Sequence, residues 1–318
     1  MRIVSSTSVL LFLLAACIGE APDAAARVQP VTAQDTAPLE IRFLDVGQGD
    51  AILIRSGDKV ALVDAGSSDN VVQKLRAAGV GHIDLAVASH NHADHIGGMD
   101  AVLDSLPVRM YLDNGHPATT RIQARVLQRV ESRNITYLQV TTRNIGLGNA
   151  TLRVLPPPQI ATGAEEQNNR SVGLIVEQGT FRALLTGDSE TQAINGWLEA
   201  NMIPEVNVLK AAHHGSRNGV TPAWLARTRP EVVVISLAAD NSYGHPHVAA
   251  LRLYCAGDRR VFRTDWHGDV VVRVEPSGRY QVRATRRAPP PATPASPGRA
   301  SGRARTAAGI PPDCGVRP

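Results

Sequence analysis

Short apolar runs alternate with segments of helical periodicity along residues 39–285, and this alternation predicts a mixed α/β fold. Runs such as Leu85–Ser89 are typical of buried strands, whereas Thr119–Arg133 carries apolar residues spaced by four, as an amphipathic helix does. The predicted strands are 41–46, 51–55, 60–64, 85–89, 109–112, 135–138, 151–155, 171–177, 181–186, 206–210, 232–237, 261–264, 269–274 and 280–284. The predicted helices are 70–78, 98–105, 119–133, 190–200, 222–226 and 248–254. Hairpins come first and alternating units follow, so we expect sheets covered by helices, an α/β (α+β) architecture.

The N-terminus has the pattern of an export signal over residues 1–17. Arg2 precedes the apolar run Val9–Ala16, which is too short to span a bilayer. The run ends at Cys17 and resembles a bacterial lipoprotein signal, in which the lipidated cysteine would tether the protein to a membrane. Ordinary cleavage near residues 24–26 is the alternative. Both place the protein outside the cytoplasm, in the periplasm or at the cell surface, and no later segment is long and apolar enough for a transmembrane helix.

The net charge of the chain is concentrated in its C-terminal tail. The whole chain carries +4 from 33 basic and 29 acidic residues, whereas residues 286–318 alone contain six arginines and one aspartate. The remainder is therefore almost neutral, and composition does not indicate a basic nucleic-acid groove on the folded body. We expect residues 18–38 to be a linker, residues 39–285 to be one folded domain, and the Pro- and Arg-rich residues 286–318 to be disordered.

The cysteine count limits the kind of protein. Three cysteines, Cys17, Cys255 and Cys314, are too few for a disulfide-dense small domain or for a zinc site built from paired CxxC motifs. If Cys17 is lipidated, Cys255 and Cys314 either pair in an oxidising compartment or remain free thiols, and both alternatives stay open.

Candidate chemistry gathers where a predicted strand ends. The segment from His90 to His95 places three histidines and one aspartate within six residues, directly after the strand Leu85–Ser89. In an extended segment His90 and His92 point the same way, while a turn at Ala93 can direct Asp94 and His95 toward a second point. Imidazole and carboxylate ligands without thiolates suit Zn²⁺, with Mn²⁺ and Fe²⁺ as alternatives.

These residues resemble the HxHxDH motif of the metallo-β-lactamase superfamily, and more closely the soluble hydrolase domain of the ComEC/Rec2 DNA-uptake proteins. The resemblance rests on blocks that occur in order, namely Phe43–Ala51, Leu62–Gly66, Ser89–Gly98, Leu184–Asp188, Leu209–Lys210 with His213–Ser216, and Tyr243–Pro246. His92 is a departure, because the uptake proteins often carry aspartate there. The family's fold is an αβ/βα four-layer sandwich of two mixed β-sheets flanked by helices, with the metal site at the sheet edge.

The resemblance also implies a set of site residues for two divalent cations, expected to be zinc. The expected ligands are His90, His92, Asp94, His95, Asp188, His214 and His245, with Asp188 bridging the two ions. The expected catalytic residues are His213, as the acid that protonates the leaving oxygen, Asp64, which orients ligands or water, and Lys210, which contacts an anionic substrate.

Each of these assignments has a plainer or competing alternative. His213 and His214 could exchange roles, Asp188 could instead cap the helix 190–200, and Asp64 could only cap a turn. His245 could contact substrate rather than metal. His116 is the one histidine between residues 96 and 212, and we expect it not to be a ligand, so the missing nitrogen ligands should come from the C-terminal half.

A few other polar residues are less informative. Asp45 and Asp50 flank glycines that permit a tight bend, and they could be structural or functional. We expect His247 to begin a helix in solvent, and His82 and His267 to be solvated turn residues.

The expected activity is that of an exported binuclear-metal hydrolase. Two cations that share one water would lower its pKa to about 7 and supply hydroxide at neutral pH. Lys210, Ser216 and Arg217 would add donors for an anionic phosphoester, which favours a phosphodiesterase or nuclease whose substrate could be DNA. The alternatives are a phosphoester hydrolase of cell-wall polymers, a β-lactam or lactone hydrolase, and a non-catalytic metal-binding module. The oligomeric state does not follow from the sequence.

Overall fold

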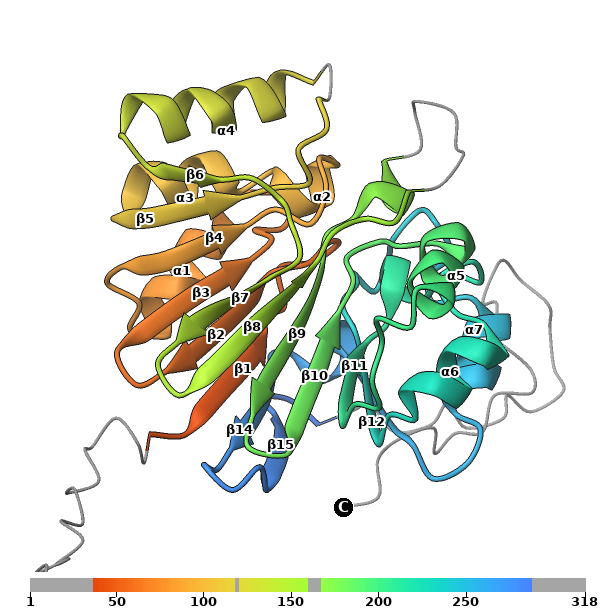
Figure 1. Cartoon of the computed structure of the whole chain (residues 1–318). Coiled ribbons are helices and arrows are strands. Elements are labelled where there is room, and N and C mark those ends of the chain that lie inside the picture. The colour runs from red at the N-terminus through yellow and green to blue at the C-terminus, as the bar shows by residue number, and fades with distance from the viewer. Residues whose placement is uncertain (1–36, 118–119, 160–166, 288–318) are drawn as a thin grey trace, which may run out of the picture. The chain divides into compact units, whose positions relative to one another are not determined.

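The computed structural model describes residues 37–117, 120–159 and 167–287 of the chain (Figure 1). The strands are β1 (Leu39–Phe43), β2 (Ile52–Ser56), β3 (Lys59–Val63), β4 (Ile83–Val87), β5 (Val108–Leu112), β6 (Thr136–Leu138), β7 (Arg143–Leu147), β8 (Ala150–Leu155), β9 (Gly173–Gln178), β10 (Phe181–Leu185), β11 (Val208–Lys210), β12 (Val232–Ile235), β13 (Arg260–Arg263), β14 (Val270–Val274) and β15 (Tyr280–Ala284). The helices are α1 (Asn70–Ala77), α2 (Ala93–Ile96), α3 (Met99–Ser105), α4 (Arg121–Ser132), α5 (Thr191–Glu199), α6 (Pro222–Thr228), α7 (Val248–Tyr254) and α8 (Thr264–His267), with 3₁₀ turns η1 (Asn168–Arg170) and η2 (Ala212–Gly215).

The described strands form two mixed sheets. The first has the order β15-β14-β1-β2-β3-β4-β5-β6, and the second has the order β13-β12-β11-β10-β9-β8-β7. Hairpins contribute antiparallel pairs such as β2 with β3, β1 also pairs antiparallel with the distant β14, and β3 with β4 and β10 with β11 are parallel pairs. Parallel strands need crossover connections, and helices provide them here.

Alternation along the strands separates the apolar side chains into layers. On β2, Ile52 and Ile54 belong to the core between the two sheets, whereas Leu53 packs beneath helices α1 to α4 on the other face. On β10, Leu184 faces the layer that contains Trp197 and Trp224 from α5 and α6. Helices therefore cover the outer face of each sheet, as Figure 1 shows. The predicted four-layer αβ/βα sandwich is confirmed.

Some elements differ from the sequence-based expectation. β7 was not predicted, because the segment 143–147 contains Arg143, Asn144 and Gly146 and has no apolar run. The turn expected at Ala93 is a short helix, α2. The expectation that His267 is solvated is wrong, because its side chain is buried at the end of α8, where Nδ1 accepts a hydrogen bond from the Arg263 backbone N–H.

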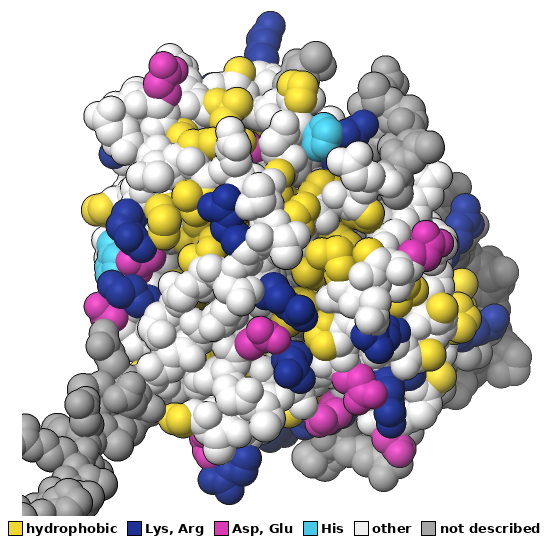
Figure 2. Space-filling model, viewed as in Figure 1, with side chains coloured by type: hydrophobic (Ala, Val, Ile, Leu, Met, Phe, Trp, Pro, Cys, Tyr) yellow, Lys and Arg dark blue, Asp and Glu magenta, His cyan; other side chains and the backbone are white. Residues whose placement is uncertain are grey.

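Several expectations concern residues outside this description. The export signal, the linker up to residue 36 and most of the C-terminal tail lie there, as do Cys17 and Cys314. Among the described residues, no helix has the length and apolar character of a membrane span. Figure 2 shows one face of the molecule, on which basic and acidic side chains of the described residues are interspersed and no continuous basic patch is visible.

Candidate metal centre

The candidate site lies where parallel strands of both sheets end. Asp64 follows β3 in a left-handed backbone conformation (φ 59°), and the segment from His90 to His95 follows β4. In the other sheet, Asp188 follows β10, and His213 and His214 follow β11. The carboxyl ends of these strands meet, so the fold gathers side chains that are more than one hundred residues apart in sequence.

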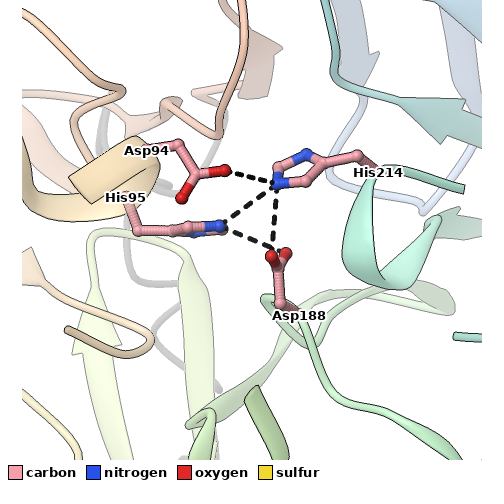
Figure 3. Close-up of side chains that lie close together, drawn as sticks. All are labelled: Asp94, His95, Asp188 and His214. Atoms are coloured by element: carbon pink, nitrogen blue, oxygen red, sulfur yellow. Dashed lines mark hydrogen bonds and ion pairs between the residues drawn. The ribbon is translucent and has the colours of Figure 1, made fainter. Parts of the chain in front are cut away.

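Four of the predicted ligands form a compact cluster, Asp94, His95, Asp188 and His214 (Figure 3). One nitrogen or oxygen atom from each lies within 4.8 Å of the others. His214 Nε2 is 3.2 Å from Asp94 Oδ2 and 3.2 Å from Asp188 Oδ2. His95 Nε2 is 3.2 Å from Asp188 Oδ1. Two imidazole nitrogens and two carboxylates that converge on one point are a donor set suited to Zn²⁺ or another divalent transition metal.

His90 and His92 form an adjoining pair. His90 Nε2 lies 3.0 Å from His92 Nδ1, and the two rings meet edge to face with centroids 4.7 Å apart. The His90 ring centroid is 4.2 Å from that of His95, which joins the pair to the four-residue cluster. The site therefore offers two neighbouring groups of ligand atoms, and each contributes at least one residue to the lining of the pocket described below.

Hydrogen bonds behind the cluster orient the two buried imidazoles. Asp64 accepts hydrogen bonds from the backbone N–H and the hydroxyl of Ser89, and its Oδ2 lies 2.8 Å from His95 Nδ1. The Nδ1–H of His95 therefore donates a hydrogen bond to the Asp64 carboxylate, and Nε2 faces the cluster. His214 Nδ1 donates in the same way to the Ser236 carbonyl oxygen at 2.8 Å.

The carboxylates of the cluster stabilise positive charge on its two imidazoles. Burial alone would lower the pKa of His214, but the carboxylates of Asp188 and Asp94 raise it to about 9. Burial would likewise lower the pKa of His95, yet Asp188 and Asp64 raise it well above its usual range. Burial and the neighbouring His95 hold the pKa of His90 well below its usual value. The surroundings of Asp188 thus favour positive charge on its partners, which is the electrostatic condition for holding a metal cation.

Lys210 does not occupy the place that was expected of it. Its side chain is fully buried, its ammonium forms an ion pair with Asp50, and it donates a hydrogen bond to the Gly187 carbonyl oxygen at 3.1 Å. Nζ also lies 3.7 Å from Asp188 Oδ1. The expected contact with substrate is therefore contradicted, because the ammonium has no exposed surface. Lys210 instead lies beneath the ligand cluster, on the floor of the site, where it holds Asp50 and the Gly187 backbone.

Ser216 and Arg217, the two other donors expected for an anionic substrate, also lie outside the lining of the pocket described below. Ser216 is buried, and the backbone N–H of Arg217 donates to His247 Nδ1 at 3.0 Å, with neither residue lining the pocket. His116 contacts Arg170 and is not in the cluster, as expected.

A pocket of about 620 Å³ opens above the cluster. Its lining consists of Gln48, Ser67, His92, Ala93, Asp94, Asn168, Asp188, His213, His214, Asn241, Ser242, Tyr243 and His245. His213 Nδ1 lies 3.2 Å from Glu190 Oε1, and its Nε2 is 4.0 Å from Asp188 Oδ2. His245 lies at the rim, with its ring centroid 6.3 Å from that of His214. Burial, together with the neighbouring histidines, lowers the pKa of His245 to about 4.

Sequence reasoning did not single out Ser89, Ser236 and Glu190. The partner of each lies elsewhere in the fold, so no local spacing marks it. The sequence is consistent with a structural or a functional role for Asp50, and its ion pair with Lys210 places it beneath the site.

A family model of the metallo-beta-lactamase superfamily matches residues 44–239. ComE operon protein 3 of Bacillus subtilis is 27% identical over 259 residues, which cover 74% of this chain and 33% of that protein. Recombination protein 2 of Haemophilus influenzae is 27% identical over 234 residues, which cover 67% of this chain and 26% of that protein. The chain thus spans about a third or less of the length of these curated relatives.

Comparison with solved structures finds the same fold in other proteins. CmlA, a diiron beta-hydroxylase from Streptomyces venezuelae, aligns with a TM-score of 0.50 and 15% identity, over 74% of this chain and 54% of that protein. At this identity the likeness concerns architecture alone. Because the family model covers more than half of the chain, and because the described fold is the four-layer sandwich, the chain belongs to the metallo-beta-lactamase superfamily, whose members are generally metal-dependent hydrolases.

Proposed function

We propose that this protein is a metal-dependent phosphodiesterase that cleaves nucleic acid. The observation that carries the proposal is the convergence of Asp94, His95, Asp188 and His214 beside His90 and His92 on the floor of an open pocket. Two adjoining groups of nitrogen and oxygen ligands suit a pair of divalent cations, with zinc favoured over manganese or iron. When bound, such cations activate water and stabilise negative charge on the substrate.

The protein's own residues would hold and move the proton of the leaving group. His213 lines the pocket, and Glu190 Oε1 lies 3.2 Å from its Nδ1, which orients the ring. Nε2 then faces the pocket as a proton donor for a leaving oxygen. His214, whose Nε2 points into the cluster, is the ligand of the pair in this proposal. The carboxylate of Asp64 keeps the His95 tautomer that directs Nε2 to the cluster.

Two observations support nucleic acid as the substrate class. One relative is named a recombination protein, and recombination is a process of nucleic acids. The pocket also presents neutral hydrogen-bonding side chains, Gln48, Asn168 and Ser242, around the ligand cluster, which suit phosphate and sugar oxygens. We extend the proposal to location, with export through residues 1–17 and a membrane tether at Cys17.

Elemental analysis and a substrate panel test this proposal. We expect about two transition-metal ions per chain and turnover of bis-p-nitrophenyl phosphate by the metal-loaded protein. His92→Ala should reduce turnover to background, whereas His82→Ala, a matched change of an exposed histidine at the start of β4, should not. Linear DNA, teichoic acid and nitrocefin, tested in parallel, separate nuclease activity from the cell-wall and β-lactam alternatives. Metal content near zero, or hydrolysis of nitrocefin alone, would refute the proposal.

A further inference from the structure

We propose that Tyr243 is a stacking platform for the base next to the cleaved phosphate, so that the pocket prefers unpaired nucleotides. The inference rests on the proposed nuclease function and adds a specificity-determining residue to it. Its first support is exposure, because the Tyr243 side chain is 61% exposed, the largest value among the large hydrophobic residues of the described chain. A single exposed ring is unremarkable by itself, so the argument depends on where this ring lies.

Tyr243 lines the same pocket as the ligand cluster. Its ring lies nearly parallel to that of His245, with an interplanar angle of 22° and centroids 5.7 Å apart. The His245 ring is in turn 6.3 Å from that of His214, which belongs to the cluster. A row of aromatic rings therefore leads from the metal ligands to the rim, and the tyrosine is its outermost member. A substrate phosphate at the cluster would bring a neighbouring base within reach of this ring.

The loop that carries Tyr243 is held in one conformation. The Asn241 side-chain amide donates to the carbonyl oxygens of Ala238 and His245, both at 2.8 Å. Its carbonyl oxygen accepts from the His245 backbone N–H at 2.9 Å. Gly244 completes the turn in a left-handed conformation (φ 73°), which glycine adopts without steric cost. Because the loop is ordered before binding, stacking on Tyr243 loses little conformational entropy.

The chemistry of the ring favours bases over other groups on a phosphodiester. Every base has a flat π-face, so stacking on an aromatic side chain is strong and tolerates different sequences. Glycerol and sugar units of a wall polymer have no such face. Bases within a duplex are already stacked and paired, so a base must be released before it can use the tyrosine. The geometry therefore points to single-stranded nucleic acid.

Trp266 provides a matched control. It is also a partly exposed aromatic residue, 40% exposed, but the Arg263 guanidinium covers its ring at 3.9 Å and it does not line the pocket. Loss of this ring should not affect substrate selection.

The test compares an oligothymidylate with an abasic strand of the same length, cleaved by the full-length metal-loaded protein. We expect the wild type to have a lower KM for the strand with bases. Tyr243→Ala should diminish this preference about 5- to 150-fold, the range expected for loss of one stacked base. Tyr243→Phe should retain the preference because the ring remains, and Trp266→Ala should leave both KM values unchanged.

Binding measurements separate this inference from the proposed function. Fluorescence anisotropy of the two strands, each carrying the same dye, reports stacking on the metal-loaded protein even without turnover. A base-dependent affinity that Tyr243→Ala abolishes would support the platform even if no cleavage occurs. The platform role would be overturned if Tyr243→Ala kept the wild-type preference for the strand with bases. It would also be overturned if Tyr243→Ala lost teichoic acid turnover by the same factor as turnover of the strand with bases.

Discussion

Lys210→Met tests whether a buried ammonium supports the floor of the metal centre. The Lys210 side chain has no exposed surface, and its ammonium is held between Asp50, the Gly187 carbonyl oxygen and Asp188. Methionine has a similar length and can fill the same space without the charge. The substitution therefore leaves the Asp50 carboxylate buried without its main positive partner.

The magnitude follows from this burial. Removal of one partner from a buried ion pair costs about 3–5 kcal/mol, since the remaining charge stays desolvated. For a domain of this size each kcal/mol lowers Tm by about 2–4 °C, so we expect a decrease of about 6–20 °C. Lys59→Met is a suitable control, because Lys59 is 39% exposed, its nearer partner Asp58 is exposed, and its second partner Asp84 keeps ion-pair contacts with His82 and Arg109. The control should cost less than about 1 kcal/mol.

Urea unfolding in the presence of a chelator provides the assay, because bound cations then add nothing to the stability. The double variant Lys210→Met/Asp50→Asn should recover part of the loss, since it leaves no unpaired charge at this position. If Lys210→Met does not fold, the double variant measured against Asp50→Asn gives the cost of removing the ammonium once its partner is neutral, and this cost should be below about 3 kcal/mol. A loss for Lys210→Met no larger than that for Lys59→Met would show that the buried pair does not stabilise the site.

Three further predictions concern the ligands, the backbone and pH. Asp64→Asn removes the acceptor that orients His95 and should weaken Zn²⁺ binding about 10- to 100-fold in competition with a chromophoric chelator, and unchanged affinity would contradict this role. Gly49→Ala should cost about 1–3 kcal/mol more in urea unfolding than Gly47→Ala, because both glycines have positive φ but only the Cβ at Gly49 collides with backbone, and equal losses would count against this. Burial lowers the pKa of His267, so the folded state disfavours its charged form and stability should fall as the pH drops below about 6.5, by at most about 1.4 kcal/mol per pH unit. The decline should be smaller in His267→Gln, and identical slopes for the two proteins would refute the effect.

Much of the fold could be predicted because its elements carry local signals. The helix expected over residues 119–133 is α4, Arg121–Ser132, whose start is defined by a hydrogen bond from the Gln123 N–H to the Thr120 hydroxyl. β10 appears within its predicted range because all its side chains except Arg182 are apolar, and they pack on both faces of the strand. β7 could not be predicted, since Arg143 and Gly146 give no strand pattern and pairing with β8 forms the strand.

The candidate ligands were also recognisable from local spacing, but their relations to one another were not. The HxHxDH segment lies within six residues, and its chemistry follows from residue type alone. The choice between His213 and His214 depends on which imidazole faces Asp188 and Asp94, and those partners come from other strands. The role expected of Lys210 failed for the same reason, since nothing near it in sequence indicates complete burial.

The amino-acid sequence by itself determined the order of strands and helices and the kinds of ligand at the strand ends, because alternation and residue chemistry act over a few neighbouring positions. Only the tertiary structure decided which side chains meet. The pairs Lys210 with Asp50, His213 with Glu190 and His95 with His214 depend on how two sheets pack and where their strands end. That packing buries the Lys210 ammonium, places His213 at the pocket and orients each imidazole.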